Sequence, residues 1–329
     1  MSPWTVAPGG NATAGSASAR AAAILRSREA RATELGTGIA ELTGDPPAFA
    51  RALHDAFVEL ADPEYRAGQA FVAPGIGPTH GVRTPLQVDL RRAFEKASRH
   101  ASPSELLLVC DRLLREPERE ARWFAISTLQ RTLPSDPERT WQLLRRAAAE
   151  ADDWITVDDL AHPYAKGILA EPYRWAELEQ LTISPSRWER RLVGSTVATI
   201  PYVNRRLGRS PDVVARALPL LGSLIGDAEP DVQKALSWGY RSMAIVDLPA
   251  TTAALEREAK VAAEHEDGNR AWVVRDSLSK LEPTAAARIR QTLAKVRRRA
   301  GAAATSQASQ LAGRFAGMAL GRPMPEPPL

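Results

Sequence analysis

Apolar residues recur at steps of three and four along most of the chain, which is the period of an α-helix with one buried face. The period is clearest in LLLVCDRLL, WFAISTLQRTL, VVARALPLLGSLI and VQKALSWGYRSMAIV, which begin at Leu106, Trp123, Val213 and Val232. No segment shows the alternation of apolar and polar residues between tight turns that is typical of β-hairpins. The pattern therefore predicts an all-α protein without a sheet.

Prolines that follow a polar residue mark the expected starts of six helices. Proline fits the first turn of a helix, and the polar side chain before it can cap the free backbone N–H groups. The prolines are Pro103, Pro117, Pro137, Pro185, Pro211 and Pro230. Two of the intervals between them, 117 to 137 and 211 to 230, have the length of one helix and a turn, so a helix pair takes about 40 residues, as in HEAT repeats. We therefore expect a right-handed α-solenoid of stacked antiparallel helix pairs, similar to an ARM-repeat superhelix.

Both ends of the chain depart from the helical pattern. Residues 1–20 are mainly Gly, Ser, Ala and Thr without periodicity, and residues 301–329 end in RPMPEPPL. These segments are predicted to be a disordered N-terminal tail and a partly disordered C-terminal tail, around a single repeat domain over residues 21–300. The stretch QLAGRFAGMALG, from Gln310, leaves a short docking helix open as an alternative.

Charge and composition narrow the class of protein only a little. The 329 residues contain 43 Lys and Arg against 39 Asp and Glu, a formal net charge of +4, and only six of the basic residues are lysines. Arginine binds phosphate well, but an excess of Arg and Ala is equally typical of a GC-rich genome. A single cysteine, Cys110, excludes an intramolecular disulfide. Without a leader peptide or 18 consecutive apolar residues, we expect a soluble cytoplasmic protein without membrane contact.

The sequence predicts no metal or redox cofactor. The five histidines are scattered, and no two of them are four residues apart, the spacing that places two ligands on one helix face. The glycine-rich segment from Ala73 to Gly81 lacks the GK[ST] ending of a nucleotide-binding P-loop.

Three segments carry candidate chemistry. In DDWITVDDLAHPY, Trp154 and Asp158 share one helix face. In SRWERRLVGSTVATIPYVNRR, four arginines gather on a predicted helix that is otherwise rich in small apolar residues: Arg190, Arg191, Arg205 and Arg206. Taken alone, Trp154 and Asp158 are better explained by a half-buried aromatic ring beside a solvated acid. The structural explanation of the arginines is a solvated basic surface.

The third segment is EPDVQKALSWGYRSMA, where Lys234, Trp238 and Arg241 follow one stripe of a helix. An aromatic ring between two cations suits a nucleic-acid backbone beside a stacked base. Taken alone, the pattern is better explained by a core tryptophan with two basic side chains that reach solvent.

Together, these segments resemble the AlkD family of HEAT-like-repeat DNA glycosylases, which remove alkylated purines. The resemblance rests on HGVRTPLQVDLRRAF, EREARWFAISTLQR, DDWITVDDL, SRWERRLV and DVQKALSWGYR, which occur in the family's order. It implies that Trp154 and Trp238 flank the deoxyribose of the damaged nucleotide and that Asp158 is the essential carboxylate. It also implies that Arg191 and Arg241 contact the DNA backbone.

The resemblance implies a glycosylase that hydrolyses the N-glycosidic bond of cationic N3- or N7-alkylpurines in double-stranded DNA without a cofactor. We expect it to be monofunctional because no lysine is placed beside Asp158 in the matched pattern, and a self-contained solenoid favours a monomer. We add Arg190 and Lys234 as expected DNA contacts because they lie in the two basic segments. One alternative is a noncatalytic helical-repeat scaffold that binds DNA or protein. A narrower form of the glycosylase hypothesis is self-resistance, in which the enzyme removes a bulky adduct formed by a DNA-alkylating natural product of the host.

Overall fold

The computed structural model describes residues 11–73 and 75–315, which form helices α1 to α16 and three short 3-10 turns. Among these residues the only paired extended backbone is an isolated antiparallel bridge between Ala61 and Val82. The prediction of an all-α protein is confirmed, and the helices are consistent with a helical-repeat solenoid. Their contacts divide the chain into two compact units, Met1–Ser135 and Asp136–Leu329.

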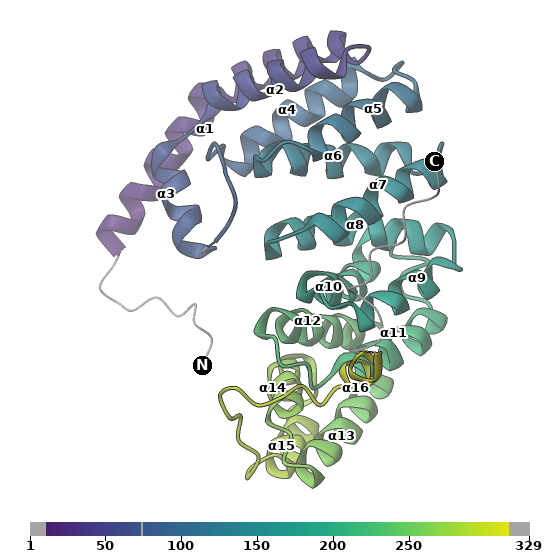
Figure 1. Ribbon diagram of the computed structural model, residues 1–329. Helices are drawn as coiled ribbons and strands as arrows, with labels where there is room; N and C mark the ends of the chain where they lie inside the picture. The colour runs from purple at the N-terminus through teal and green to yellow at the C-terminus, as the bar shows by residue number, and fades with distance from the viewer. Residues whose placement is uncertain (1–10, 74, 316–329) are drawn as a thin grey trace. The chain divides into compact units, whose positions relative to one another are not determined.

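Unit 1, Met1–Ser135, has a core of phenylalanine side chains from three helices. The rings of Phe49, Phe94 and Phe124 lie 5.1–6.0 Å apart between centroids, and all three side chains are fully buried. Tilted and edge-on pairs of this kind stabilise a core beyond the area that they bury. The helices of unit 1 (Figure 1) are α1 (Asn11–Ile39), α2 (Pro46–Leu60), α3 (Pro63–Val72), α4 (Thr84–Ala97), α5 (Pro103–Leu114) and α6 (Arg119–Thr132), with the 3-10 turn η1 (Ala40–Leu42).

Unit 2, Asp136–Leu329, arranges alternate helices in two rows (Figure 1). Helices α8 (Trp154–Ala170), α10 (Arg187–Val203), α12 (Pro230–Val246) and α14 (Gly268–Ser277) contact one another in turn and form the first row. The second row contains α11 (Pro211–Leu224), α13 (Leu248–Glu264) and α15 (Pro283–Thr292). A helix returns to the first row about every 40 residues, as expected of paired helical repeats. The other elements are α7 (Pro137–Glu150), α9 (Arg174–Gln180), η2 (Leu181–Ile183), η3 (Leu278–Lys280) and α16 (Gln307–Phe315).

The proline signals predict four of the six helix starts correctly. Helices α5, α7, α11 and α12 begin at Pro103, Pro137, Pro211 and Pro230. At α5 the side chain of Ser102 caps the N–H of Glu105, while the Glu105 carboxylate accepts a hydrogen bond from the N–H of Ser102. The other two starts are wrong by two residues, because α6 begins at Arg119 and α10 at Arg187, so that Pro117 and Pro185 belong to the preceding turns.

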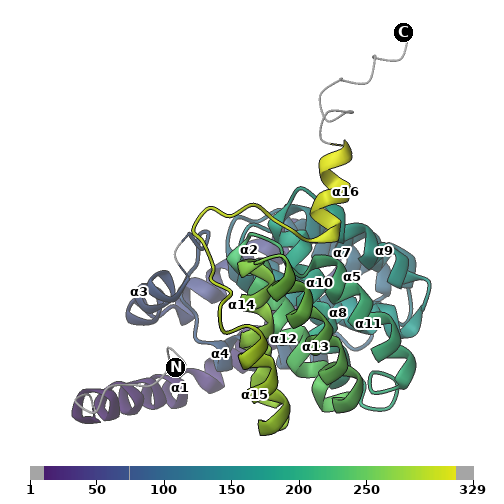
Figure 2. The same ribbon diagram turned by 90° about the horizontal axis from the view of Figure 1, so that it is seen from below.

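The described parts of both predicted tails contain helices. Helix α1 begins at Asn11, so residues 11–20 of the expected tail are helical, since alanine favours a helix even without amphipathic periodicity. Near the other end, the chain returns from α15 to α16 (Figure 2). Helix α16 packs on α11 and η2. Ser306 and Ala308 are buried there, and residues 310–315 of the stretch that the sequence left open lie in this docked helix. Residues 1–10 and 316–329 lie outside the described residues.

Residues 21–300 were expected to form one repeat domain, and they divide between the two units. Helical repeats contact mainly their neighbours along the chain, so their contacts group into successive blocks. In the part of the chain that the structure describes, no helix combines the length and the apolar character needed to cross a bilayer.

Candidate active site

The candidate carboxylate, Asp158, lies in the second turn of α8 and belongs wholly to unit 2. Asp153 caps this helix: its carboxylate accepts hydrogen bonds from the N–H groups of Ile155 and Thr156 at 2.8 and 2.9 Å and from the Thr156 hydroxyl at 2.6 Å. A capped first turn fixes the backbone from which Trp154 and Asp158 project. Both of these side chains are half-buried.

The next helix of the row, α10, holds the carboxylate of Asp158 from one side. Arg191 donates from Nε to Oδ1 at 3.1 Å and from Nη2 to Oδ2 at 2.8 Å, which is the bidentate arrangement of a guanidinium and a carboxylate. Ser195, one turn further along α10, donates its hydroxyl to Oδ1 at 2.6 Å. These three hydrogen bonds determine the orientation of the Asp158 carboxylate.

The two members of the ion pair differ in their access to solvent. The side chain of Arg191 is 7% exposed and that of Asp158 is 24% exposed. The remaining Nη1 of Arg191 donates to the carbonyl of Asp231 at 2.8 Å, and the guanidinium lies 5.9 Å from the centre of the Trp154 ring. A group approaching this surface would meet the carboxylate before it met the buried guanidinium.

Trp238 lies on α12, which packs closely on α10. A Cβ atom on Gly194 of α10 would lie 2.7 Å from the backbone carbon of Ala235, so only glycine permits the observed spacing. The structure thus places Trp154 and Trp238 on the two helices that flank α10, each half-buried.

A second cluster of Asp, Arg and Ser side chains lies between α12 and α14. The carboxylate of Asp276 accepts the hydroxyl of Ser237 and Nη1 of Arg241, both at 2.6 Å. Arg241 is 27% exposed and Asp276 is 45% exposed, so this ion pair is more open to solvent than the pair at Asp158. Lys234, one turn before Trp238, is exposed.

Comparison with protein-family models gives a match over residues 53–281 to a family described as DNA alkylation repair enzyme. The chain belongs to this family. The match includes every predicted site residue, and it indicates a role in DNA alkylation repair with DNA as the partner. A search of curated protein sequences finds no match.

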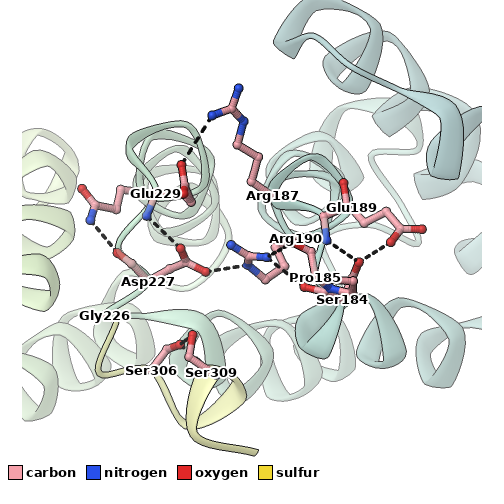
Figure 3. Close-up of polar contacts among 12 residues, drawn as sticks. Ser184, Pro185, Arg187, Glu189, Arg190, Gly226, Asp227, Glu229, Ser306 and Ser309 are labelled. Carbon is pink, nitrogen blue, oxygen red and sulfur yellow. Dashed lines mark hydrogen bonds and ion pairs between the residues drawn. The ribbon is translucent and has the colours of Figure 1, made fainter. Parts of the chain in front are cut away.

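In this member of the DNA alkylation repair family, Arg190 has other partners than its neighbour Arg191. Figure 3 shows Arg190 between Asp227 and the turn at Ser184 and Pro185. Its Nε donates to the carboxylate of Asp227 at 2.7 Å, and its Nη1 donates to the carbonyls of Ser184 and Pro185 at 2.8 and 3.1 Å. Asp227 is 1% exposed at its side chain. Arg190 therefore joins α10 to the turn before α12, and its contact with DNA stays a prediction.

Three residues near the expected site of this repair protein were not singled out from the sequence. Ser195 and Asp276 contact Asp158 and Arg241 respectively, and His162 follows Asp158 by one turn of α8. Burial and the nearby ammonium group of Lys166 lower the pKa of His162 below its usual value. Spacing gives a signal for two of them, because Ser195 and His162 lie four residues after Arg191 and Asp158. Asp276 has no such signal.

Proposed function

We propose that this protein is a monofunctional DNA glycosylase that hydrolyses the N-glycosidic bond of N3- or N7-alkylated purines in duplex DNA. The observation that carries the proposal is the Asp158 carboxylate, fixed by Arg191 and Ser195 and partly open to solvent beside Trp154. Family membership supplies the class of substrate, alkylated DNA.

The substrate needs little activation. A purine alkylated at N3 or N7 carries a positive charge and leaves as a neutral base, taking the electrons of the glycosidic bond. Positive charge then develops on the sugar in an oxocarbenium-like transition state. Water attacks the anomeric carbon and loses one proton, and the products are the free base and an abasic site.

Asp158 suits the stabilisation of that charge. A carboxylate that is already oriented needs no rearrangement as the sugar becomes positive, which is the basis of electrostatic catalysis by preorganised groups. Its Arg191 partner is more deeply buried, so the field outside the surface is dominated by the nearer carboxylate. The same carboxylate can orient the attacking water or accept its proton. The faces of Trp154 and Trp238 attract a cationic sugar edge.

Arg191 acts in this proposal as a positioning residue. All three of its guanidinium nitrogens donate to Asp158 or to the carbonyl of Asp231. In this proposal the phosphate backbone is contacted instead by Lys234 and Arg241, the more exposed cations of α12.

The proposal also includes the absence of lyase activity. A lyase would need a lysine amine at the sugar to form a Schiff base. Lys166 follows Asp158 by eight residues on α8, about 12 Å along the helix axis. Lys234 precedes Trp238 by one turn on α12 and is proposed to bind phosphate.

The decisive experiment measures base release in a single turnover. Duplex DNA containing N7-methylguanine, N3-methyladenine or a bulky N3-adenine adduct is incubated with the native protein or with Asp158→Asn. We expect the variant to release bases about 10²–10³ times more slowly, with DNA affinity unchanged in an anisotropy titration. The matched control is Asp212→Asn, which removes an exposed carboxylate from α11 in the second row.

Each outcome separates the alternatives. Faster release of the bulky adduct than of the methylated bases would favour self-resistance over general repair. DNA binding without release of any base would indicate the noncatalytic scaffold. Release by Asp158→Asn at the native rate would contradict the proposed mechanism.

A further inference from the structure

Unit 1 contains a cluster of metal-ligating side chains that is separate from the proposed glycosylase residues. His54 lies on α2, His80 in the segment between α3 and α4, and Glu118 at the N-cap of α6. One potential ligand atom from each of the three lies within 4.8 Å of the others. The two imidazole rings meet edge to face, with their centroids 4.8 Å apart.

The backbone that carries His80 is held in place by a buried carboxylate. Glu120 accepts hydrogen bonds from the Thr79 hydroxyl at 2.6 Å and from the N–H groups of His80, Gly81 and Val82 at 3.2, 2.9 and 3.3 Å. Glu120 is fully buried. The position of His80 is thus fixed from α6, the same helix that carries Glu118 at its N-cap.

Three further features hold this segment in place. Gly81 has a φ of +81°, and a Cβ atom there would lie 2.5 Å from the Cβ of Arg66, so the turn requires glycine. The N–H of Asp62 donates to the carbonyl of Gly81 at 3.0 Å. The ring of His80 also packs against Phe57, with centroids 5.9 Å apart. An anchored backbone and an apolar neighbour are typical surroundings of a ligand that must keep one orientation.

We propose that His54, His80 and Glu118 bind a divalent transition metal ion such as Zn²⁺. Two imidazole nitrogens and one carboxylate oxygen form a donor set that suits Zn²⁺, Co²⁺ or Ni²⁺ and is poorly suited to Mg²⁺, which prefers oxygen ligands. Three protein ligands leave a fourth position for water. The ion would join α2, the segment before α4 and the start of α6.

The three ligand atoms need to move only slightly closer together to bind an ion. Ligands about 2.1 Å from a tetrahedral ion lie roughly 3.4 Å apart, whereas the present separations reach 4.8 Å. His54 is exposed and Glu118 half-buried, so both side chains can move toward the more tightly held His80. The sequence did not reveal the cluster, because 26 residues separate the two histidines and 38 separate His80 from Glu118.

The test is metal binding by the full-length protein without a histidine tag, treated with a chelator and then dialysed. Calorimetric titration with Zn²⁺ should show one equivalent bound, and Co²⁺ should give the visible absorption of a site with nitrogen ligands. His80→Ala and Glu118→Gln should each weaken Zn²⁺ binding at least about 100-fold, because loss of a direct ligand exceeds the effect of its outer partners. The matched control is His265→Ala, which removes an exposed histidine from unit 2.

Thermal unfolding gives an independent readout. Binding only to the folded state raises the melting temperature, so Zn²⁺ should stabilise the native protein and the His265→Ala variant, whereas Mg²⁺ should not. His54→Gln, at an exposed position, should lose this stabilisation while its circular dichroism without metal matches that of the native protein. Undiminished binding by the His54, His80 and Glu118 variants, or no binding by the native protein, would overturn the proposal.

Discussion

Two arginines three residues apart on α10 show how strongly the surroundings of a side chain determine its role (Figure 3). Arg187 lies 3.6 Å from Glu229, and the two side chains are 49% and 40% exposed. Arg190 and Asp227 are 14% and 1% exposed, and the carboxylate of Asp227 also accepts the N–H of Glu229 at 2.9 Å. Exposed pairs contribute little to stability, whereas removal of one partner from a buried pair leaves an uncompensated charge.

Arg190→Ala is therefore expected to destabilise the protein by about 3 kcal/mol, because it leaves Asp227 buried without its partner. Arg187→Ala, the matched control, should cost roughly 0–1 kcal/mol. Urea unfolding of both variants gives these values, and an anisotropy titration gives their affinity for duplex DNA. If Arg190→Ala weakened DNA binding and left stability unchanged, the role in DNA contact expected from the sequence would be correct and the structural role wrong.

The sequence suggested which residues belong to the candidate site but not which of them contact one another. The two tryptophans, Asp158 and Arg191 were identified from the resemblance. The sequence did not indicate that Arg191 holds Asp158 across 33 residues, or that Arg241 pairs with Asp276 across 35. Such contacts depend on which helices become neighbours, and spacing along one helix carries no information about that.

At the scale of elements, small residues determine how closely the helices of the first row approach. Gly194 of α10 faces the backbone of Ala235, and Gly239 of α12 lies against Leu221 and the carbonyl of Gly194. A larger side chain at Gly194 would separate α10 from α12, whereas one at Gly239 would first meet the side chain of Leu221 on α11. The candidate site depends on this spacing, because α10 carries Arg191 and α12 carries Trp238.

Gly194→Ala is accordingly expected to destabilise unit 2 by about 1–3 kcal/mol, despite the higher helix propensity of alanine. Gly222→Ala on α11 is the matched control: the nearest atom to its new Cβ would be the Glu258 carboxylate oxygen at 3.5 Å. This variant should be more stable than the native protein by roughly 0.5–1 kcal/mol. Urea unfolding would measure both changes, and equal behaviour of the two variants would show that α10 and α12 can separate at little cost.

The elements themselves were largely predictable, because apolar period and capping act within a few residues. Pro103 and Pro137 mark helix starts that are capped by Ser102 and Asp136. Pro117 and Pro185 fail as markers because a proline is equally compatible with the turn before a helix. The docked α16 was left open for a related reason: whether a short amphipathic segment folds depends on a partner surface, here α11 and η2, that lies elsewhere in the chain.

For the whole molecule, the location of the charges matters more than their sum. Forty-three basic residues exceed 39 acidic ones by only four, so a uniform distribution would attract DNA weakly. Several arginines are neutralised by neighbouring carboxylates, as Arg191 is by Asp158 and Arg190 by Asp227. Exposed cations on the first row of unit 2 are therefore expected to supply the sequence-independent part of DNA binding.

Salt dependence tests this expectation. Each phosphate contact contributes about 0.9 to the slope of log K against log salt concentration. Lys234→Ala should make the slope for duplex DNA shallower by about that amount, because Lys234 is exposed on α12 beside Trp238. Lys260→Ala removes another exposed lysine, from α13 in the second row, and should leave the slope unchanged. Equal effects of the two variants would mean that DNA responds to the overall charge, and the assignment of the first row as the DNA-binding surface would be wrong.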